Sequence, residues 1–205
     1  MKRTIPLLVL LVVCTAAVLA PYYLKAREAA RRREAYAQML ANSTPLVLDA
    51  KTTAILSGAD RVETFRLAGG GDEDYTKEEQ ATISGPNTRY FENYPVLQVG
   101  SVQGRAFAGA LNKALLQVSS EANGSQCYEP GIGFRVWKGA SHRDICICFH
   151  CGGLEVLPHG SVRDDAHQNP YYLPTSLGQS RPVLLALSKQ AFPQDKALAA
   201  LPDQL

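Results

Sequence analysis

The sequence lacks every catalytic motif that would assign a reaction directly. It has no nucleophile elbow, no HExxH, no kinase signature and no phosphate-binding P-loop. The glycine run at residues 69–71 is followed by acidic residues, where a P-loop requires Lys and then Ser or Thr. There is no internal repeat and no regular alternation of strands with helices, which argues against a solenoid or a doubly wound parallel sheet. The motifs therefore assign no enzymatic reaction to this chain.

The net positive charge of the chain is confined to the first forty residues. Residues 1–40 hold seven Lys or Arg against two Glu, a net charge of +5, whereas the whole chain carries +2. The remaining chain is therefore at −3. A mildly acidic globule has no electrostatic basis for binding the phosphates of DNA or RNA. We expect no nucleic-acid partner.

An uncharged run of twenty residues, 5–24, follows the basic pair at the N-terminus. As a helix, this run would cross a hydrocarbon core of about 30 Å. We interpret residues 1–24 as an uncleaved transmembrane anchor, with the lipid bilayer as the partner of residues 5–24 and a single-pass membrane localisation. A cleaved signal peptide is the alternative, although Pro21 would impede cleavage just before it. The basic residues on both flanks leave the side of the membrane open.

The rest of the chain is expected to form a stalk and one domain. Residues 25–44 are rich in strong helix formers and in Arg, which favours a basic helical stalk. Residues 45–205 are long enough to bury one hydrophobic core. Within them, alternating strand-like runs precede and follow segments with helical spacing of apolar residues. We therefore predict an α+β fold, a small antiparallel sheet with packed helices, preceded by the N-terminal transmembrane helix and stalk.

Two alternating runs, 132–137 and 143–149, predict a β-hairpin with its turn near Gly139. Matching their apolar residues places Phe134 and Ile147 on the core face, with Arg135 and Cys146 on the opposite face. The same match sets Arg135 near Cys146 across the hairpin. Because truncation of a core side chain typically costs about 2–5 kcal/mol, we expect Ile147→Ala to destabilise the domain far more than Arg135→Ala.

Four of the five cysteines lie in the C-terminal half, and thiols pair, bind metal or react. Zinc would use the CxxC of Cys148 and Cys151 with Cys127, Cys146 or His150. Cys146 and Cys148, two apart on a strand, would lie about 6.5 Å from each other, which is wide for one ion. A redox pair would use Cys148 and Cys151. A structural role would leave the thiols buried or join Cys127 to Cys148 or to Cys151.

The same cysteines belong to a distinctive pattern. It reads Cys127-x-x-Pro-Gly-x-Gly-Phe-Arg-x-Trp, followed by Cys148-Phe-x-Cys151, and spans 25 residues. This pattern resembles one in uncharacterised bacterial membrane-anchored or envelope proteins that have no assigned activity. The resemblance implies a bacterial envelope protein and brings no known catalytic residues to carry over.

Two functions follow as expectations. The first is a membrane-tethered binding or interaction module with a structural cysteine cluster, whose partner is an unidentified protein or small molecule. The second is a membrane-bound thiol–disulfide or zinc-dependent enzyme that uses Cys148 and Cys151. Structural zinc is the one cofactor that the residues suggest.

Overall fold

The computed structural model describes residues 20–27, 30–31, 34, 44–69, 75–120, 129–158 and 175–203. The chain divides into two compact units, Met1–Ser43 and Thr44–Leu205, and each is described by itself. In the first unit, the described residues are helical and exposed.

The structure corrects the prediction of a single-pass membrane protein. Among the described residues, no helix is both long enough and apolar enough to cross a membrane. Residues 1–19, which hold most of the predicted anchor, lie outside the described residues.

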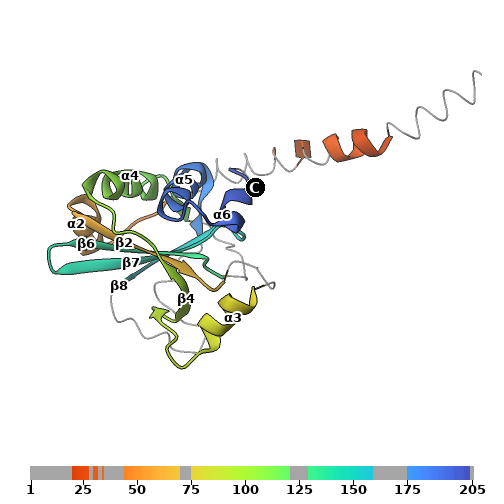
Figure 1. Ribbon diagram of the computed structural model, residues 1–205. Coiled ribbons are helices and arrows are strands. Elements are labelled where there is room, and N and C mark those ends of the chain that lie inside the picture. The colour runs from red at the N-terminus through yellow and green to blue at the C-terminus, as the bar shows by residue number, and fades with distance from the viewer. Residues whose placement is uncertain are drawn as a thin grey trace, which may run out of the picture. The chain divides into compact units, whose positions relative to one another are not determined.

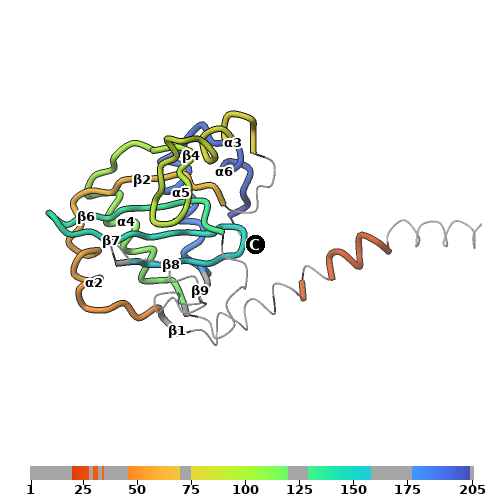
Figure 2. Tube along the Cα trace, turned by 90° about the horizontal axis from the view of Figure 1, so that it is seen from below, coloured from red at the N-terminus to blue at the C-terminus, as the bar shows by residue number. Residues whose placement is uncertain are grey.

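The second unit is built on one curled antiparallel sheet of six strands, which forms a half-barrel (Figures 1 and 2). Its strands, in spatial order, are β3 (Tyr90–Phe91), β4 (Tyr94–Val99), β2 (Arg61–Leu67), β6 (Ile132–Lys138), β7 (Ser141–Cys148) and β8 (Gly153–Pro158). A second, small sheet joins β1 (Thr44–Pro45), β5 (Ser119–Ser120) and β9 (Thr175–Ser176). The predicted α+β class with an antiparallel sheet is confirmed.

The helices of this unit are α2 (Ala50–Ser57), α3 (Lys77–Ser84), α4 (Arg105–Leu115), the short 3-10 helix η1 (Gly178–Ser180), α5 (Arg181–Ala191) and α6 (Lys196–Ala200). Side chains stabilise several helix starts, because the first N–H groups of a helix have no partner within it. Asp49 accepts from Thr52 N at α2, and Thr76 and Glu79 form a capping box at α3. Ser180 does not cap α5, and its hydroxyl instead donates to the carbonyl of Ala114 at the end of α4.

The main core lies between the sheet and the helices that cover one of its faces, among them α4 and α5 (Figure 1). Phe134 and Ile147 are fully buried in it, and the Phe134 ring meets Phe107 of α4 edge-on at 5.7 Å. The other face of the sheet carries a smaller apolar cluster, made of Leu67, Phe91, Val96, Cys146 and Leu157. The predicted faces of the hairpin are therefore confirmed, but both faces are covered.

The register of the β6–β7 hairpin differs from the predicted one by two residues. Ile147 pairs with Ile132, and Arg135 pairs with Asp144 in place of Cys146. The turn is shorter than expected, with Gly139 in the left-handed region at φ 57° and Lys138 already paired with Ser141. A shift of two residues keeps every side chain on its face, because strand side chains alternate with a period of two.

Candidate functional site

The two cysteines of the CxxC motif are joined to each other. Cys148 is the last residue of β7, and its sulfur forms a disulfide with Cys151, which lies in the turn before β8. The Cα atoms of the pair are 5.6 Å apart. This is the pair that the redox hypothesis uses, and it differs from the two structural pairings, in which Cys127 supplied one partner. Cys127 lies outside the described residues. A local turn brings the two thiols together because only two residues separate them.

Hydrogen bonds to its backbone carbonyls hold this CxxC turn from both sides. The carbonyl of Phe149 accepts from Nη1 of the buried Arg181 at 2.5 Å, and the Phe149 ring is packed in the main core. The carbonyl of Gly152 accepts from Leu177 N at 2.9 Å, and Gly152 takes φ 69°, a left-handed conformation suited to glycine. The turn that carries the disulfide is therefore fixed to the N-terminal end of α5.

The two sulfurs of the pair differ in their surroundings. Cys148 is fully buried, Cys151 is partly exposed, and His150 between them is exposed. The backbone N–H of Cys151 donates to Sγ of Cys148 at 3.2 Å. An N–H aimed at a sulfur stabilises a thiolate more than a thiol, because the interaction with the anion is charge-assisted. Cys151 is thus the sulfur that a solute can reach, and Cys148 is the one that the backbone would stabilise as an anion.

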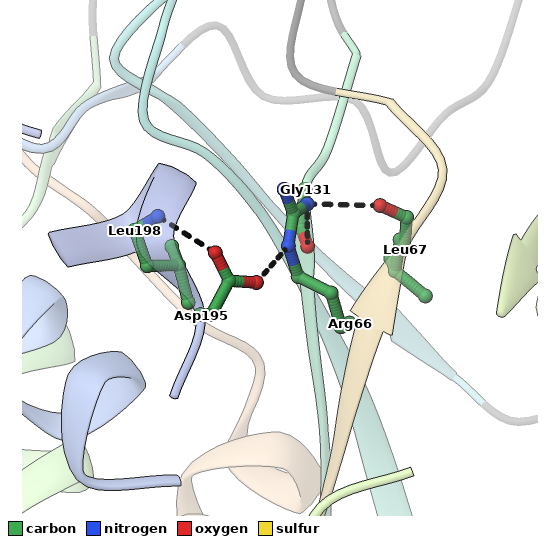
Figure 3. A network of polar contacts seen from close by, with 5 residues as sticks. All are labelled: Arg66, Leu67, Gly131, Asp195 and Leu198. Atoms are coloured by element: carbon green, nitrogen blue, oxygen red, sulfur yellow. Dashed lines mark hydrogen bonds and ion pairs between the residues drawn. The ribbon is translucent and has the colours of Figure 1, made fainter. Parts of the chain in front are cut away.

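A small cavity adjoins the turn. It has a volume of about 40 Å³ and is lined by residues that include Phe149, His150, Arg66, Gly131 and Leu198. Arg66 crosses its wall, with Nε donating to Asp195 at 2.8 Å and Nη1 donating to the carbonyls of Leu67 and Gly131 (Figure 3). A space of this size admits a water molecule or a methyl-sized group, and pockets for larger ligands measure several hundred Å³.

The zinc hypothesis finds no ligand set in the described part of the chain. Within those ranges, no three His, Cys, Asp or Glu side chains are arranged to hold a metal ion. Cys148 and Cys151 are bonded to each other, and zinc binds thiolates. Cys146 is fully buried on the face of the sheet opposite the main core. Its cross-strand neighbours are Gly133 and Glu155.

Sequence reasoning missed a buried charge cluster on this same face. Asp144 is fully buried, and Arg135 donates two hydrogen bonds to its carboxylate, from Nε at 2.8 Å and from Nη2 at 2.7 Å. The hydrogen bonding with Asp144 raises the pKa of Arg135 above its ordinary value. A planar guanidinium matches both oxygens of a carboxylate, which makes this one of the strongest side-chain contacts available to a protein.

Glu92 completes the cluster from the turn between β3 and β4. Its pKa is raised to about 8, first by burial and then by the hydrogen bond and charge of Asp144, while the charge of Arg135 lowers it. Glu92 therefore keeps its proton at neutral pH. Among the described residues, it is also the only one other than glycine with a positive φ, 54°. The pair Glu92-Asn93 between Phe91 and Tyr94 is a turn signal that the sequence offered.

Comparison with models of protein families, with curated proteins and with solved structures gives no match. The resemblance to bacterial envelope proteins therefore stays a prediction. The fold and site define an α+β domain with a disulfide-closed CxxC turn, and its function has to be argued from these residues.

Proposed function

We propose that this domain is a thiol–disulfide module, in which Cys148 and Cys151 exchange electrons with a dithiol or a disulfide of another protein. The observation that carries the proposal is the bond between two cysteines only three positions apart, one of which is partly exposed. A CxxC pair on a rigid turn keeps both sulfurs within reach of each other in the oxidised and reduced states.

The exchange follows from the different surroundings of the sulfurs. A thiolate of a partner dithiol attacks Sγ of Cys151, forms a mixed disulfide with it and expels Cys148 as a thiolate. The N–H of Cys151 stabilises this leaving group, which takes up a proton from solvent. The second thiol of the partner, as its thiolate, attacks the mixed disulfide and releases Cys151. Two electrons pass from the partner to the domain, which becomes a dithiol while the partner becomes a disulfide.

The small size of the closed ring also favours a chemical role. In the chain-entropy model, a disulfide around about four residues contributes about 2 kcal/mol to stability, less than the bond across a long loop that the sequence suggested. The register of β7 and β8 already fixes the same turn, with Cys148 opposite Gly153. The bond therefore adds little constraint that the sheet does not supply.

The reduction potential of the full-length protein tests the proposal. Equilibration with glutathione buffers and mass analysis of the peptide that contains Cys148 and Cys151 should give a potential between about −270 and −120 mV, the range of exchange-active pairs. Cys146→Ser is the matched control and should leave this potential unchanged. A potential below about −300 mV, with reduction only after denaturation, would contradict the proposal.

Single-cysteine variants test the order of attack. In Cys148→Ser, the partly exposed Cys151 should form a mixed disulfide with oxidised glutathione at least tenfold faster than Cys148 does in Cys151→Ser, because access controls the rate. Mass spectrometry of the quenched reaction measures both rates. Equal rates, or faster reaction at Cys148, would contradict the role given to Cys151.

The second candidate is a binding or interaction domain in which the disulfide is structural. The complete burial of Cys148 favours it, because resistance to reduction accompanies inaccessible sulfur. This candidate predicts the low potential that would overturn the first, so the same titration separates the two.

A further inference from the structure

The β3–β4 hairpin lies on the face of the sheet opposite the main helices, and its contact there centres on Phe91 (Figure 1). Phe91 is buried and packs against Phe65, with 4.5 Å between ring centroids. The guanidinium of Arg135 lies 5.3 Å from the centroid of Phe91. Gly133 leaves room for this ring, since a Cβ at that position would lie 2.7 Å from it. Side-chain contacts therefore hold the tip of the hairpin, the turn at residues 91–94, on β6.

Backbone pairing holds this tip weakly. The two-residue β3 is the outermost strand and, among the described strands, pairs with β4 alone. Pro95 has no N–H to give to a ladder, and the backbone bonds beside it are that of its carbonyl, which accepts from Ala68 N at 2.8 Å, and that of Val96 N, which donates to the carbonyl of Arg89 at 2.8 Å. The ladder from β4 to β2 includes Val96 but changes register between Arg66 and Leu67. The tip can therefore leave β6 and β7 while the ladders among β2, β6, β7 and β8 stay intact.

Charged groups from three strands act on the pKa of Glu92 at the tip. These are Asp144 of β7, Arg135 of β6 and Glu155 of β8. Glu63 of β2 adds a fourth carboxylate near the guanidinium of Arg135, which is already bound to Asp144 through two hydrogen bonds. A neutral Glu92 carboxyl can donate a hydrogen bond to Asp144, whereas an ionised one has no proton to donate and is repelled.

We propose that the β3–β4 hairpin is a proton-controlled strap, docked on β6 and β7 while Glu92 is protonated and released when Glu92 ionises. Release also lets Glu92 leave its left-handed backbone conformation, which is strained for a residue with a Cβ. The released hairpin would uncover the side chain of Cys146, which packs in the same apolar cluster as Phe91. The proposal does not depend on the thiol–disulfide function.

The direction of the pH dependence follows from linkage. The docked state binds one more proton than the released state between the ordinary pKa of Glu92, 4.5, and its raised pKa of about 8. Docking is therefore strongest at low pH and is lost as the pH rises. The opening equilibrium constant should increase roughly tenfold per pH unit between about pH 5.5 and 7.5, and level off above about pH 8.

Hydrogen exchange of the full-length protein, measured by mass spectrometry and corrected for the intrinsic pH dependence of exchange, tests the strap. Peptides covering residues 90–96 should show the tenfold rise per pH unit. Peptides covering residues 143–149 in the core of the sheet should not. A parallel rise in both regions would mean global destabilisation and would overturn the proposal.

Two matched variants isolate the group responsible. Glu92→Gln keeps a hydrogen-bond donor and cannot ionise, so the opening constant of the hairpin should become independent of pH. Glu63→Gln removes a negative charge near the same guanidinium and should keep the wild-type slope. The proposal is wrong if Glu92→Gln retains that slope or if Glu63→Gln abolishes it.

Discussion

Replacing Arg135 by alanine is expected to destabilise the domain by about 3–5 kcal/mol, because it leaves the carboxylate of Asp144 buried without its counter-charge. Asp144 is fully buried and takes two hydrogen bonds from Arg135. Ile147→Ala should cost a similar amount, about 2–5 kcal/mol, by leaving a cavity in the main core. Urea unfolding of the full chain measures both, and Trp137, its only tryptophan, can serve as the fluorescent probe.

Arg61→Ala is the matched control on the neighbouring strand. The side chain of Arg61 is 47% exposed, and its contact with Glu63 is a surface ion pair at 3.7 Å. Such pairs contribute about 1 kcal/mol or less, and the cation–π contact of Arg61 with Trp137, 4.7 Å from the ring centroid, contributes about 0.5–1 kcal/mol at an exposed site. Arg61→Ala should therefore cost clearly less than Arg135→Ala, and its transition midpoint is read from the denaturant dependence because the Trp137 signal itself changes. An effect of Arg135→Ala as small as that of Arg61→Ala would show that the pair with Asp144 contributes little to folding.

The expected effect of Arg135→Ala, similar to that of Ile147→Ala, removes the large difference between these two variants that the sequence predicted. That prediction treated the face of Arg135 as the less sensitive one, because alternation shows which side chains share a face but not what covers it. This face is covered by the tip of the β3–β4 hairpin, which carries Phe91. Phe91 is 42 residues from Gly133 in the sequence, and its ring fills the space beside that glycine. Long-range docking of this kind leaves no periodic signal in either segment.

Local patterns predicted the fold class and the two faces of the β6–β7 hairpin because both depend on periodicity alone. The predicted register of this hairpin was wrong because a shift of two residues preserves the match of apolar side chains. The length of the turn selects between the two registers, and the turn is shorter than predicted. The CxxC spacing identified Cys148 and Cys151 as a pair that could take part in redox chemistry or bind zinc. Their mutual bond competed with bonds to Cys127, and spacing alone could not choose among these pairings.

Asp195 supports the wall of the cavity beside the CxxC turn, and its removal should be the other large effect. Its Oδ1 accepts from Leu198 N at 2.8 Å and caps α6, while its Oδ2 accepts from Nε of Arg66 at 2.8 Å (Figure 3). The two side chains are only 9% and 13% exposed, for Arg66 and Asp195 respectively. Breaking a buried pair typically costs about 3–5 kcal/mol, and loss of an N-cap about 1 kcal/mol.

Two replacements separate these contributions. Asp195→Ala loses the cap and the ion pair together, whereas Asp195→Ser keeps a capping oxygen but is too short and uncharged to bind Arg66 in the same way. Unfolding free energies of the full chain should therefore fall in the order wild type, Ser, Ala, with the serine variant about 1 kcal/mol above the alanine variant. If the serine variant matched the wild type, the ion pair with Arg66 would contribute nothing. If the serine variant were as unstable as the alanine variant, the N-cap would contribute nothing to the stability of α6. The wall of the cavity would then be held in place by Arg66 alone.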